Sequence, residues 1–326
     1  MKISKIYLLS FGIKTMAATA MAASALAILA PASAMAHGFE GDRFFPPTIQ
    51  TDDPFATDEL SLPTISIFNN PASSDGTPKT REIDIGAEFD KEIFPKFAVG
   101  ISTTYVILKP QGGTATDGCQ NLTLGAKYQL WEIPEREFIF SVGAEWEIGN
   151  TGSQSIGVDT FSTFTPTLYF GKGFGDLPDG VKFLKPIAVT ATAGLDLPVK
   201  VDEPNAIEWG LAIEYSLPYL EEHVKDTGLA RPFRDMIPLV EFAVTNPLNR
   251  DGGQAIGTIN PGVLWENPDF QLGVEAVIPI NKNTGPNVGV VFNVQIFIDD
   301  IFPKLFGHPL FGGGETNNTP APAFTK

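Results

Sequence analysis

The residues of this sequence whose types and spacing could support chemistry are mainly carboxylates at alternating positions of short segments. Asp84 and Glu88 lie within one such segment, and Glu145 lies within another. Because side chains two residues apart point to the same side of a β-strand, these acids would share one face of a sheet. If that face encloses water, they form an acidic lining that could select cations or amines, or could simply be hydrated. Counted from the centres of their segments, six candidate lining residues are expected to form one belt near mid-depth: Asp84, Glu88, Glu145, Glu214, Glu241 and Glu275.

Residues suited to catalysis or metal binding are few. The histidines after the first 36 residues are His37, His223 and His308, and all three lie outside the alternating segments. A Ser–His pair would need a histidine on such a segment, and a zinc site would need several His or Cys ligands within reach. Cys119 is the only cysteine, and we interpret it as an ordinary loop residue. We therefore expect no catalytic residues, no metal and no cofactor.

The alternation itself is the strongest structural signal. Between Glu137 and Ile148, apolar residues occupy one face and mostly acidic or small residues the other, with only Ile139 out of place. A period of two residues indicates β-strands. Twelve segments follow this pattern: residues 59–69, 81–91, 96–108, 120–131, 137–149, 160–171, 186–197, 206–218, 235–245, 254–265, 269–281 and 287–299.

These strands could belong to a soluble β-sandwich or to a membrane barrel. Most reach the 9–11 residues or so that a tilted strand needs to cross a bilayer, and their number is even. Short turns follow even-numbered strands, and aromatic residues cluster beside those turns, as in a barrel with an interfacial belt. The sequence therefore predicts an all-β fold, a twelve-stranded antiparallel transmembrane β-barrel over residues 59–299, in the outer membrane of a Gram-negative bacterium.

The two ends of the chain differ in composition from this region. Residues 1–36 combine basic residues, a short apolar run and small residues at 34–36, which predicts a signal peptide. Residues 37–58 are rich in Phe, Pro and Asp, and we expect a short N-terminal periplasmic extension or a plug in the lumen. Residues 300–326 form a tail whose Gly-rich end predicts disorder. The net charge of −16 argues against nucleic acid as a partner.

Prolines within the expected strands are the main departure from an ideal barrel. Pro63 and Pro166 are two of them, and each predicts a bulge or kink because proline cannot donate a ladder hydrogen bond. The wall prolines Pro238, Pro261 and Pro279 fall on three neighbouring strands. One hypothesis is a weak sector through which an apolar ligand could leave sideways. The simpler alternative is that these prolines lie near strand ends or on bulges.

The two ends of the mature region resemble a known family. The segment HGFEGDRFFPPTIQTDDPFATDELSLPT and the ending DDIFPKLFGHPLF are similar to those of outer-membrane transporters of the family named after the meta-pathway of phenol degradation. The resemblance implies a barrel that takes up small organic compounds, with membrane lipid, a small solute and the assembly machinery as partners. The expected function is therefore a channel or transporter for a small, possibly aromatic compound. The alternative is a structural or ligand-binding barrel without transport.

Overall fold

A computed structural model describes residues 38–72, 78–248 and 253–312. The expected signal peptide, His37 and the Gly-rich end of the tail lie outside these residues. None of the helices in the described part of the chain is long and apolar enough to cross a membrane.

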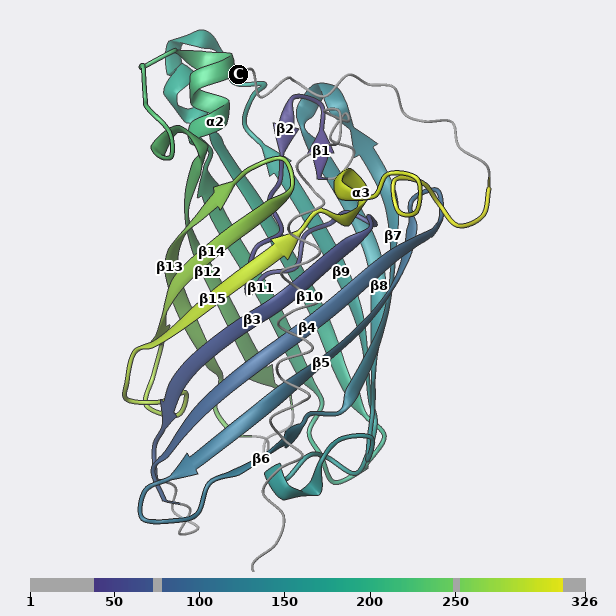
Figure 1. Cartoon of the computed structure of the whole chain (residues 1–326), viewed down its shortest axis with the longest axis vertical. Helices are drawn as coiled ribbons and strands as arrows, with labels where there is room; N and C mark the ends of the chain where they lie inside the picture. Colours follow the sequence, from purple (N-terminus) through teal and green to yellow (C-terminus); the bar gives the residue numbers. More distant parts are fainter. Residues whose placement is uncertain (1–37, 73–77, 249–252, 313–326) are drawn as a thin grey trace, which may run out of the picture. The chain divides into compact units, whose positions relative to one another are not determined.

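Twelve long antiparallel strands, all within the described ranges, form a closed barrel (Figure 1). Each strand pairs with its neighbours in the sequence, and β3 closes the ring by pairing with β15. A short strand β6 (Thr116–Cys119) extends the sheet beside β5. The wall strands are β3 (Glu59–Asn70), β4 (Thr80–Phe94), β5 (Phe97–Pro110), β7 (Leu122–Ile133), β8 (Phe138–Ile148), β9 (Thr163–Gly173), β10 (Ile187–Pro198), β11 (Ala206–Tyr215), β12 (Met236–Pro247), β13 (Ile256–Glu266), β14 (Phe270–Pro279) and β15 (Gly289–Ile296).

All twelve expected strands are confirmed, with small shifts at their ends. No end differs by more than three residues, and two of the C-terminal ends have a clear local cause. β11 stops at Tyr215 because Ser216 caps the short helix α2 (Leu217–Tyr219), its Oγ accepting a hydrogen bond of 3.2 Å from the Tyr219 amide. β15 stops at Ile296, and residues 298 and 299, expected to end the last strand, belong to the helix α3 (Ile298–Ile301).

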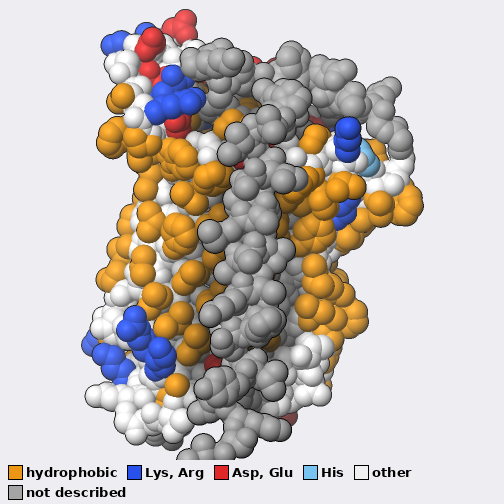
Figure 2. All heavy atoms as spheres, viewed as in Figure 1, with side chains coloured by type: hydrophobic (Ala, Val, Ile, Leu, Met, Phe, Trp, Pro, Cys, Tyr) orange, Lys and Arg blue, Asp and Glu red, His pale blue; other side chains and the backbone are white. Residues whose placement is uncertain are grey.

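The outer surface of the barrel is apolar and the inner surface is polar. Outward side chains such as Leu168, Trp146 and Phe292 are exposed, whereas inward Ser141 and Thr190 are buried. In Figure 2, hydrophobic side chains cover the wall and the charged ones gather toward its two ends. This is the arrangement required of a barrel whose outside meets lipid.

The two ends of the barrel have different connections. At the end that holds both described termini, the turns after β4, β7 and β13 are short, and the second contains the 3₁₀ turn η2 (Pro134–Arg136). Aromatic pairs flank these turns, including Phe94 with Phe97 and Trp265 with Phe270. The opposite end carries longer loops, β6 and the turn η3 (Gln154–Ile156). Short turns mark the periplasmic end of an outer-membrane barrel, so both described termini lie on the periplasmic side.

Two periplasmic connections are long and contain local helical structure. The link between β9 and β10 holds the 3₁₀ segment η4 (Asp179–Leu184). The link between β11 and β12 holds α2, the π-helical turn η5 (Leu220–Val224) and the 3₁₀ turn η6 (Phe233–Asp235). They cover part of the periplasmic rim.

Residues 38–58, here called the lumen segment, precede the barrel wall. Their first part is a small hairpin of β1 (Phe39–Glu40) and β2 (Arg43–Phe44), and the rest is irregular. The lumen segment lies against inward-facing side chains of β7, β8, β12 and β14. It therefore occupies the interior of the barrel on its periplasmic half.

Prediction for the lipid-facing wall. Replacing Leu168 with arginine should destabilise the barrel by about 2–4 kcal/mol, because the outward side chain of this mid-strand residue is half exposed and a cation there would meet lipid. Thr167→Arg is the matched control on the inward face of the same strand and should cost less. Urea unfolding in lipid vesicles, followed by the mobility shift of folded barrels on gels, measures both. If both variants lose the same free energy of unfolding, the assignment of Leu168 to the lipid-facing side and Thr167 to the inner side is wrong.

Candidate functional site

The central feature of the barrel interior is a single carboxylate that holds three consecutive backbone amides of the lumen segment. Oε2 of Glu241, on β12, accepts hydrogen bonds of 3.0 Å from the amides of Ile49 and Gln50, and Oε1 accepts one of 2.8 Å from Thr51. Glu241 is fully buried. Hydrogen bonds to an ionised acceptor are stronger than neutral ones, so this contact is a main anchor of the lumen segment.

Other wall side chains bind the remaining polar groups of the lumen segment. Gln271 on β14 donates to the Pro47 carbonyl at 2.7 Å, and Gln129 on β7 accepts from the Ala56 amide at 2.9 Å. Lys127 on β7 pairs with the Asp52 carboxylate at 2.7 Å and also donates to the Asp53 carbonyl at 2.8 Å. An irregular backbone inside a barrel has no ladder partner, so these side chains replace one.

Apolar contacts also hold the lumen segment against the inner wall. Phe45 and Phe55 form a buried cluster with Ile139 of β8 and Ala188 of β10. Phe44 and Ile49 pack against a second cluster of inward apolar residues, which consists of Ile237, Leu239 and Leu264. Ile139 was the one exception to the alternation between residues 137 and 148. The exception is real, because its side chain points inward and contacts the lumen segment.

Glycines on the wall make room for this packing. A Cβ atom on Gly210 of β11 would lie 2.8 Å from Thr51 Oγ1, and one on Gly273 of β14 would lie 2.8 Å from Ile49 Cδ1. Glycine within a strand often marks a close approach of another chain segment, and here the approaching segment is the lumen segment. The sequence alone showed these strand glycines without showing their purpose.

The β1–β2 hairpin is fastened to the periplasmic rim by Arg43. Its fully buried guanidinium pairs with Glu137 at 3.3 Å and lies 3.7 Å from the centre of the Tyr219 ring. It also donates to the carbonyls of Lys185 and Pro186, and Tyr219 donates its hydroxyl to Glu137 at 2.9 Å. Burial and the neighbouring Glu137 carboxylate raise the pKa of Tyr219, which therefore stays protonated as the donor. Arg43 is the only Lys or Arg of the lumen segment.

Acidic side chains of the lumen segment are themselves strongly affected by burial. Burial raises the pKa of Glu40 to about 8, and the nearby Glu132 carboxylate adds to this shift. Burial also raises the pKa of Asp53, with the charge of Glu59 as the next cause. Lys91 pairs with Asp58 at 2.5 Å, yet burial still raises the pKa of Asp58. At neutral pH the docked lumen segment thus holds a proton on Glu40 that a solvated carboxyl group would release.

The six candidate lining acids separate into two groups instead of forming one belt. Glu214, Glu241 and Glu275, the inner group, are at most 2% exposed and lie on the periplasmic half with the lumen segment. The position expected for Glu214, near mid-depth, is wrong because β11 ends one residue later. The outer group, Asp84, Glu88 and Glu145, is less buried and lies nearer the extracellular side.

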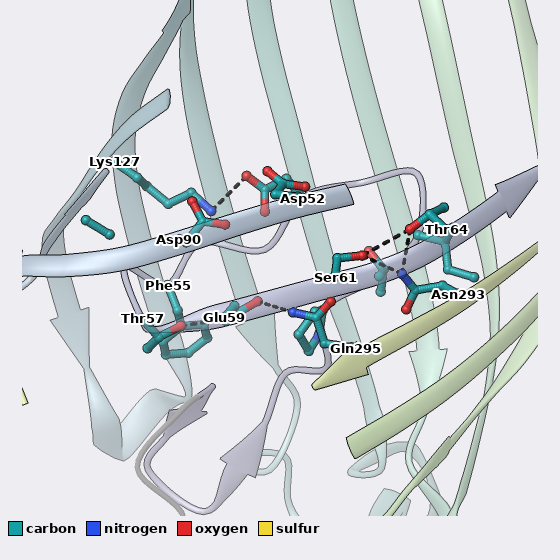
Figure 3. Close-up of a pocket in the computed structure, with 15 residues that line it drawn as sticks. Asp52, Phe55, Thr57, Glu59, Ser61, Thr64, Asp90, Lys127, Asn293 and Gln295 are labelled. Atoms are coloured by element: carbon teal, nitrogen blue, oxygen red, sulfur yellow. Dashed lines mark hydrogen bonds and ion pairs between the residues drawn. The ribbon is translucent and has the colours of Figure 1, made fainter. Parts of the chain in front are cut away.

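A polar cavity of about 90 Å³ remains between the lumen segment and the seam of β3, β4, β7 and β15 (Figure 3). Asn293 donates to the hydroxyls of Ser61 and Thr64, both at 2.8 Å, and Gln295 donates to Glu59 at 2.7 Å. This volume has room for a few water molecules and not for an organic solute. This cavity is therefore too small for such solutes in this conformation. The remaining lining residues include Asp52, Glu88, Asp90 and Lys127.

The prolines of the wall have different local effects. Pro63 lies at a register shift between β3 and β4, as expected of a bulge. Pro238 lies beyond the last β11–β12 pair, and Pro279 is the last residue of β14. Pro261 interrupts the β13–β14 ladder, which has no pair between Ile259–Ile278 and Gly262–Glu275. Two of the three wall prolines are thus near strand ends, and of the three only Pro261 interrupts a ladder in mid-strand. Pro166, expected to form a bulge or kink, likewise lies where the β9–β10 ladder has no pair, between Gly194–Thr167 and Leu197–Phe164.

The described residues bring together no familiar catalytic or metal-binding arrangement. His223 stacks on Tyr219 in the periplasmic connection, and His308 lies after α3. Cys119, expected in a loop, is exposed at the end of the short strand β6. No group of three or more His, Cys, Asp or Glu in the described ranges is placed to hold a metal ion.

Comparison with known proteins supports the fold. No family model and no curated protein matches the sequence. An outer-membrane channel from Pseudomonas putida F1 is 11% identical with a TM-score of 0.53, and the match covers 77% of this chain and 99% of the channel. A KdgM porin is 12% identical with a TM-score of 0.41, and the match covers 73% of this chain and 98% of the porin. The translocator domain of the autotransporter NalP from Neisseria meningitidis is 10% identical with a TM-score of 0.42, and the match covers 74% of this chain and 88% of that domain.

The match to the Pseudomonas putida channel, together with the closed ladder and the apolar outer wall, shows that the chain has the fold of an outer-membrane β-barrel.

Prediction for the anchor of the lumen segment. Glu241→Gln should loosen residues 49–51, because the ionised acceptor of three amides becomes a neutral amide oxygen. Losing about 1.5–3 kcal/mol corresponds to roughly a tenfold to hundredfold faster exchange of these amides with deuterium. Mass spectrometry of the peptide that contains them measures the rate. Glu145→Gln is the control, since no hydrogen bond joins Glu145 to the lumen segment within the described residues. If these amides exchange equally slowly in the Glu241 variant, the apolar contacts of the segment alone are enough to hold it in place.

Proposed function

We propose that this protein is an outer-membrane channel for small solutes in which the lumen segment acts as a displaceable gate. The observation that carries the proposal is the nature of the contacts between the segment and the wall. They are many single side-chain contacts to an irregular backbone, with Glu241 and Arg43 as the main anchors. No strand of the wall has to separate for such a segment to leave, so the barrel can remain closed to lipid while its lumen opens.

The lining supports a polar entrance on the extracellular side. Glu88 and Glu145 line a small cavity beside Asp52 of the lumen segment, and Lys127, the one base in its lining, is paired with Asp52. An excess of carboxylates in a confined aqueous space raises the local concentration of cations. A small cation or an amine-bearing organic solute fits this entrance better than an anion does. Both chain ends resemble those of the transporter family named after the meta-pathway of phenol degradation, and this resemblance supports a small organic solute.

Prediction for conductance and selectivity. Single-channel recording in planar bilayers should show a small cation-selective conductance for the full protein and a larger one after deletion of residues 38–58. The double variant Glu88→Gln and Glu145→Gln should reduce the preference for cations, and high salt should screen part of it. Glu214 is unsuitable for this test because it is buried beside the lumen segment.

Two results would count against this function. Silence of the full protein, of the deletion variant and of Glu241→Gln at every voltage would favour the alternative, a structural or ligand-binding barrel without transport. A wild-type channel that prefers anions would contradict the assignment of the acidic face to the lumen. The deletion removes only residues outside the wall, so correct folding can be checked by the gel mobility of the barrel.

Sideways release through the wall is a second candidate route, favoured by one observation, the interrupted ladder at Pro261. A proline gap in a bilayer leaves a carbonyl without its ladder donor and locally weakens the pairing of β13 with β14.

Prediction for the sideways route. A disulfide between Val263→Cys and Val274→Cys, a directly opposed pair, would hold the two strands together. In a Cys119→Ser background, the oxidised protein should take up an apolar solute more slowly than the reduced protein and conduct ions equally well. Equal uptake by the oxidised and the reduced protein would rule out the sideways route.

A further inference from the structure

The chain after α3 turns back along the outside of the barrel. The amide of Leu310 donates to the Glu92 carbonyl at 3.1 Å, and that of Phe311 donates to the Ile93 carbonyl at 2.8 Å, which fixes the segment to the periplasmic end of β4. Phe306 packs edge-on against Phe89, with 6.1 Å between ring centres. Phe89 belongs to the outward row of β4, so residues 302–311 lie on the outer surface of the wall.

This returning segment presents apolar side chains outward. Phe302, Leu305, Leu310 and Phe311 are 47–67% exposed, although Phe311 also packs on Phe94 at 5.7 Å. They continue the apolar outer wall to the level of the periplasmic aromatic residues. Figure 2 shows hydrophobic side chains with basic ones among them at this corner of the molecule. An apolar surface continuous with a lipid-facing wall is stable in contact with acyl chains and not with water.

Positive charge accompanies these apolar side chains. His308 Nδ1 lies 3.1 Å from the Pro309 carbonyl oxygen and Nε2 lies 3.0 Å from the Lys304 carbonyl oxygen. A carbonyl oxygen only accepts hydrogen bonds, so both contacts form only when both ring nitrogens carry a proton. The fold of this turn therefore favours the imidazolium form, and these two contacts raise the pKa of His308.

Lys304 adds a second positive charge, because its exposed side chain has no partner within the described residues. Lys91 is nearby and donates to the His308 carbonyl at 2.9 Å, but its own charge is balanced by Asp58. Lys91 and Asp58 are the charged neighbours from the wall and the lumen segment that act on His308. The turn thus carries a net positive charge beside exposed apolar side chains.

We propose that residues 302–311 form a binding site for the headgroup of an anionic phospholipid in the periplasmic leaflet. Lys304 donates to the headgroup phosphate and His308 contributes its charge, while the acyl chains lie along Leu305, Leu310 and Phe311. A lipid is the occupant because the surface is continuous with the lipid-facing wall and lies where headgroups begin. The site is separate from the lumen, and its occupancy does not depend on the proposed channel function.

The test is native mass spectrometry of the intact barrel purified with phosphatidylglycerol and phosphatidylcholine. The wild type should retain phosphatidylglycerol in preference, and Lys304→Gln with His308→Gln should lower that retention about fivefold for each lost charge. Lys225→Gln is the matched control, since it removes an exposed lysine from another periplasmic connection. Retention equal to that of the control would overturn the proposal.

Two further arms identify the source of the phosphate and the role of His308. Leu305→Ser with Leu310→Ser should also lower retention, whereas inorganic phosphate should not displace the lipid. Full displacement by phosphate, with no effect of the leucine changes, would show a bare anion site and refute the lipid site. Retention by the wild type should fall as the pH rises through the raised pKa of His308, because the imidazolium is then lost. His308→Gln should abolish this dependence, and its persistence in the variant would contradict the role given to His308.

Discussion

A backbone that crosses lipid must pair all of its polar groups, and this constraint shapes the whole protein. The wall satisfies it by closing a ring of antiparallel strands, with β3 joined to β15. Once the ring is closed, the alternation of side chains leaves only two environments, lipid outside and an enclosed space inside. The outside becomes apolar and the inside becomes polar because no other assignment of faces is stable in a membrane.

The same requirement extends to the lumen segment, which lacks ladder partners. Its amides and carbonyls are paired one at a time by wall side chains such as Glu241, Gln271 and Gln129. Side-chain pairing is easier to undo than a strand ladder, because each bond can be replaced by one to water. The wall and the lumen segment therefore differ in how firmly they are held, although both obey the same rule. This difference is what makes the interior able to change while the wall stays intact.

The sequence predicted the wall well and the interior poorly. A period of two residues is repeated along every strand, so the twelve strands, the outward face and the periplasmic turns could all be found without a structure. Contacts of the lumen segment have no period, because Arg43, Glu137 and Tyr219 come from three distant parts of the chain. Ile139 gave a local sign of them, since an inward apolar residue on a polar face needs an apolar partner inside the barrel. The periodic pattern predicts Glu214 near the middle of its strand, because it continues past Ser216. In the structure Ser216 caps a helix and ends β11, so Glu214 lies near the periplasmic end of the strand.

The inner acidic group also explains why the docked position of the lumen segment need not be permanent. Glu241 is satisfied by three amides, but neither carboxyl oxygen of the buried Glu214 has a hydrogen-bond partner among the described residues. Keeping such groups from water is costly whether or not they are ionised. Burial of Phe44, Phe45 and Ile49 favours docking, at about 1.5–3 kcal/mol for each large apolar side chain. Release of the segment would hydrate Glu214 while exposing those apolar groups, so the two contributions oppose each other. A docked state balanced in this way is suited to the proposed gate, whereas a permanent plug would be expected to pair or replace this carboxyl group.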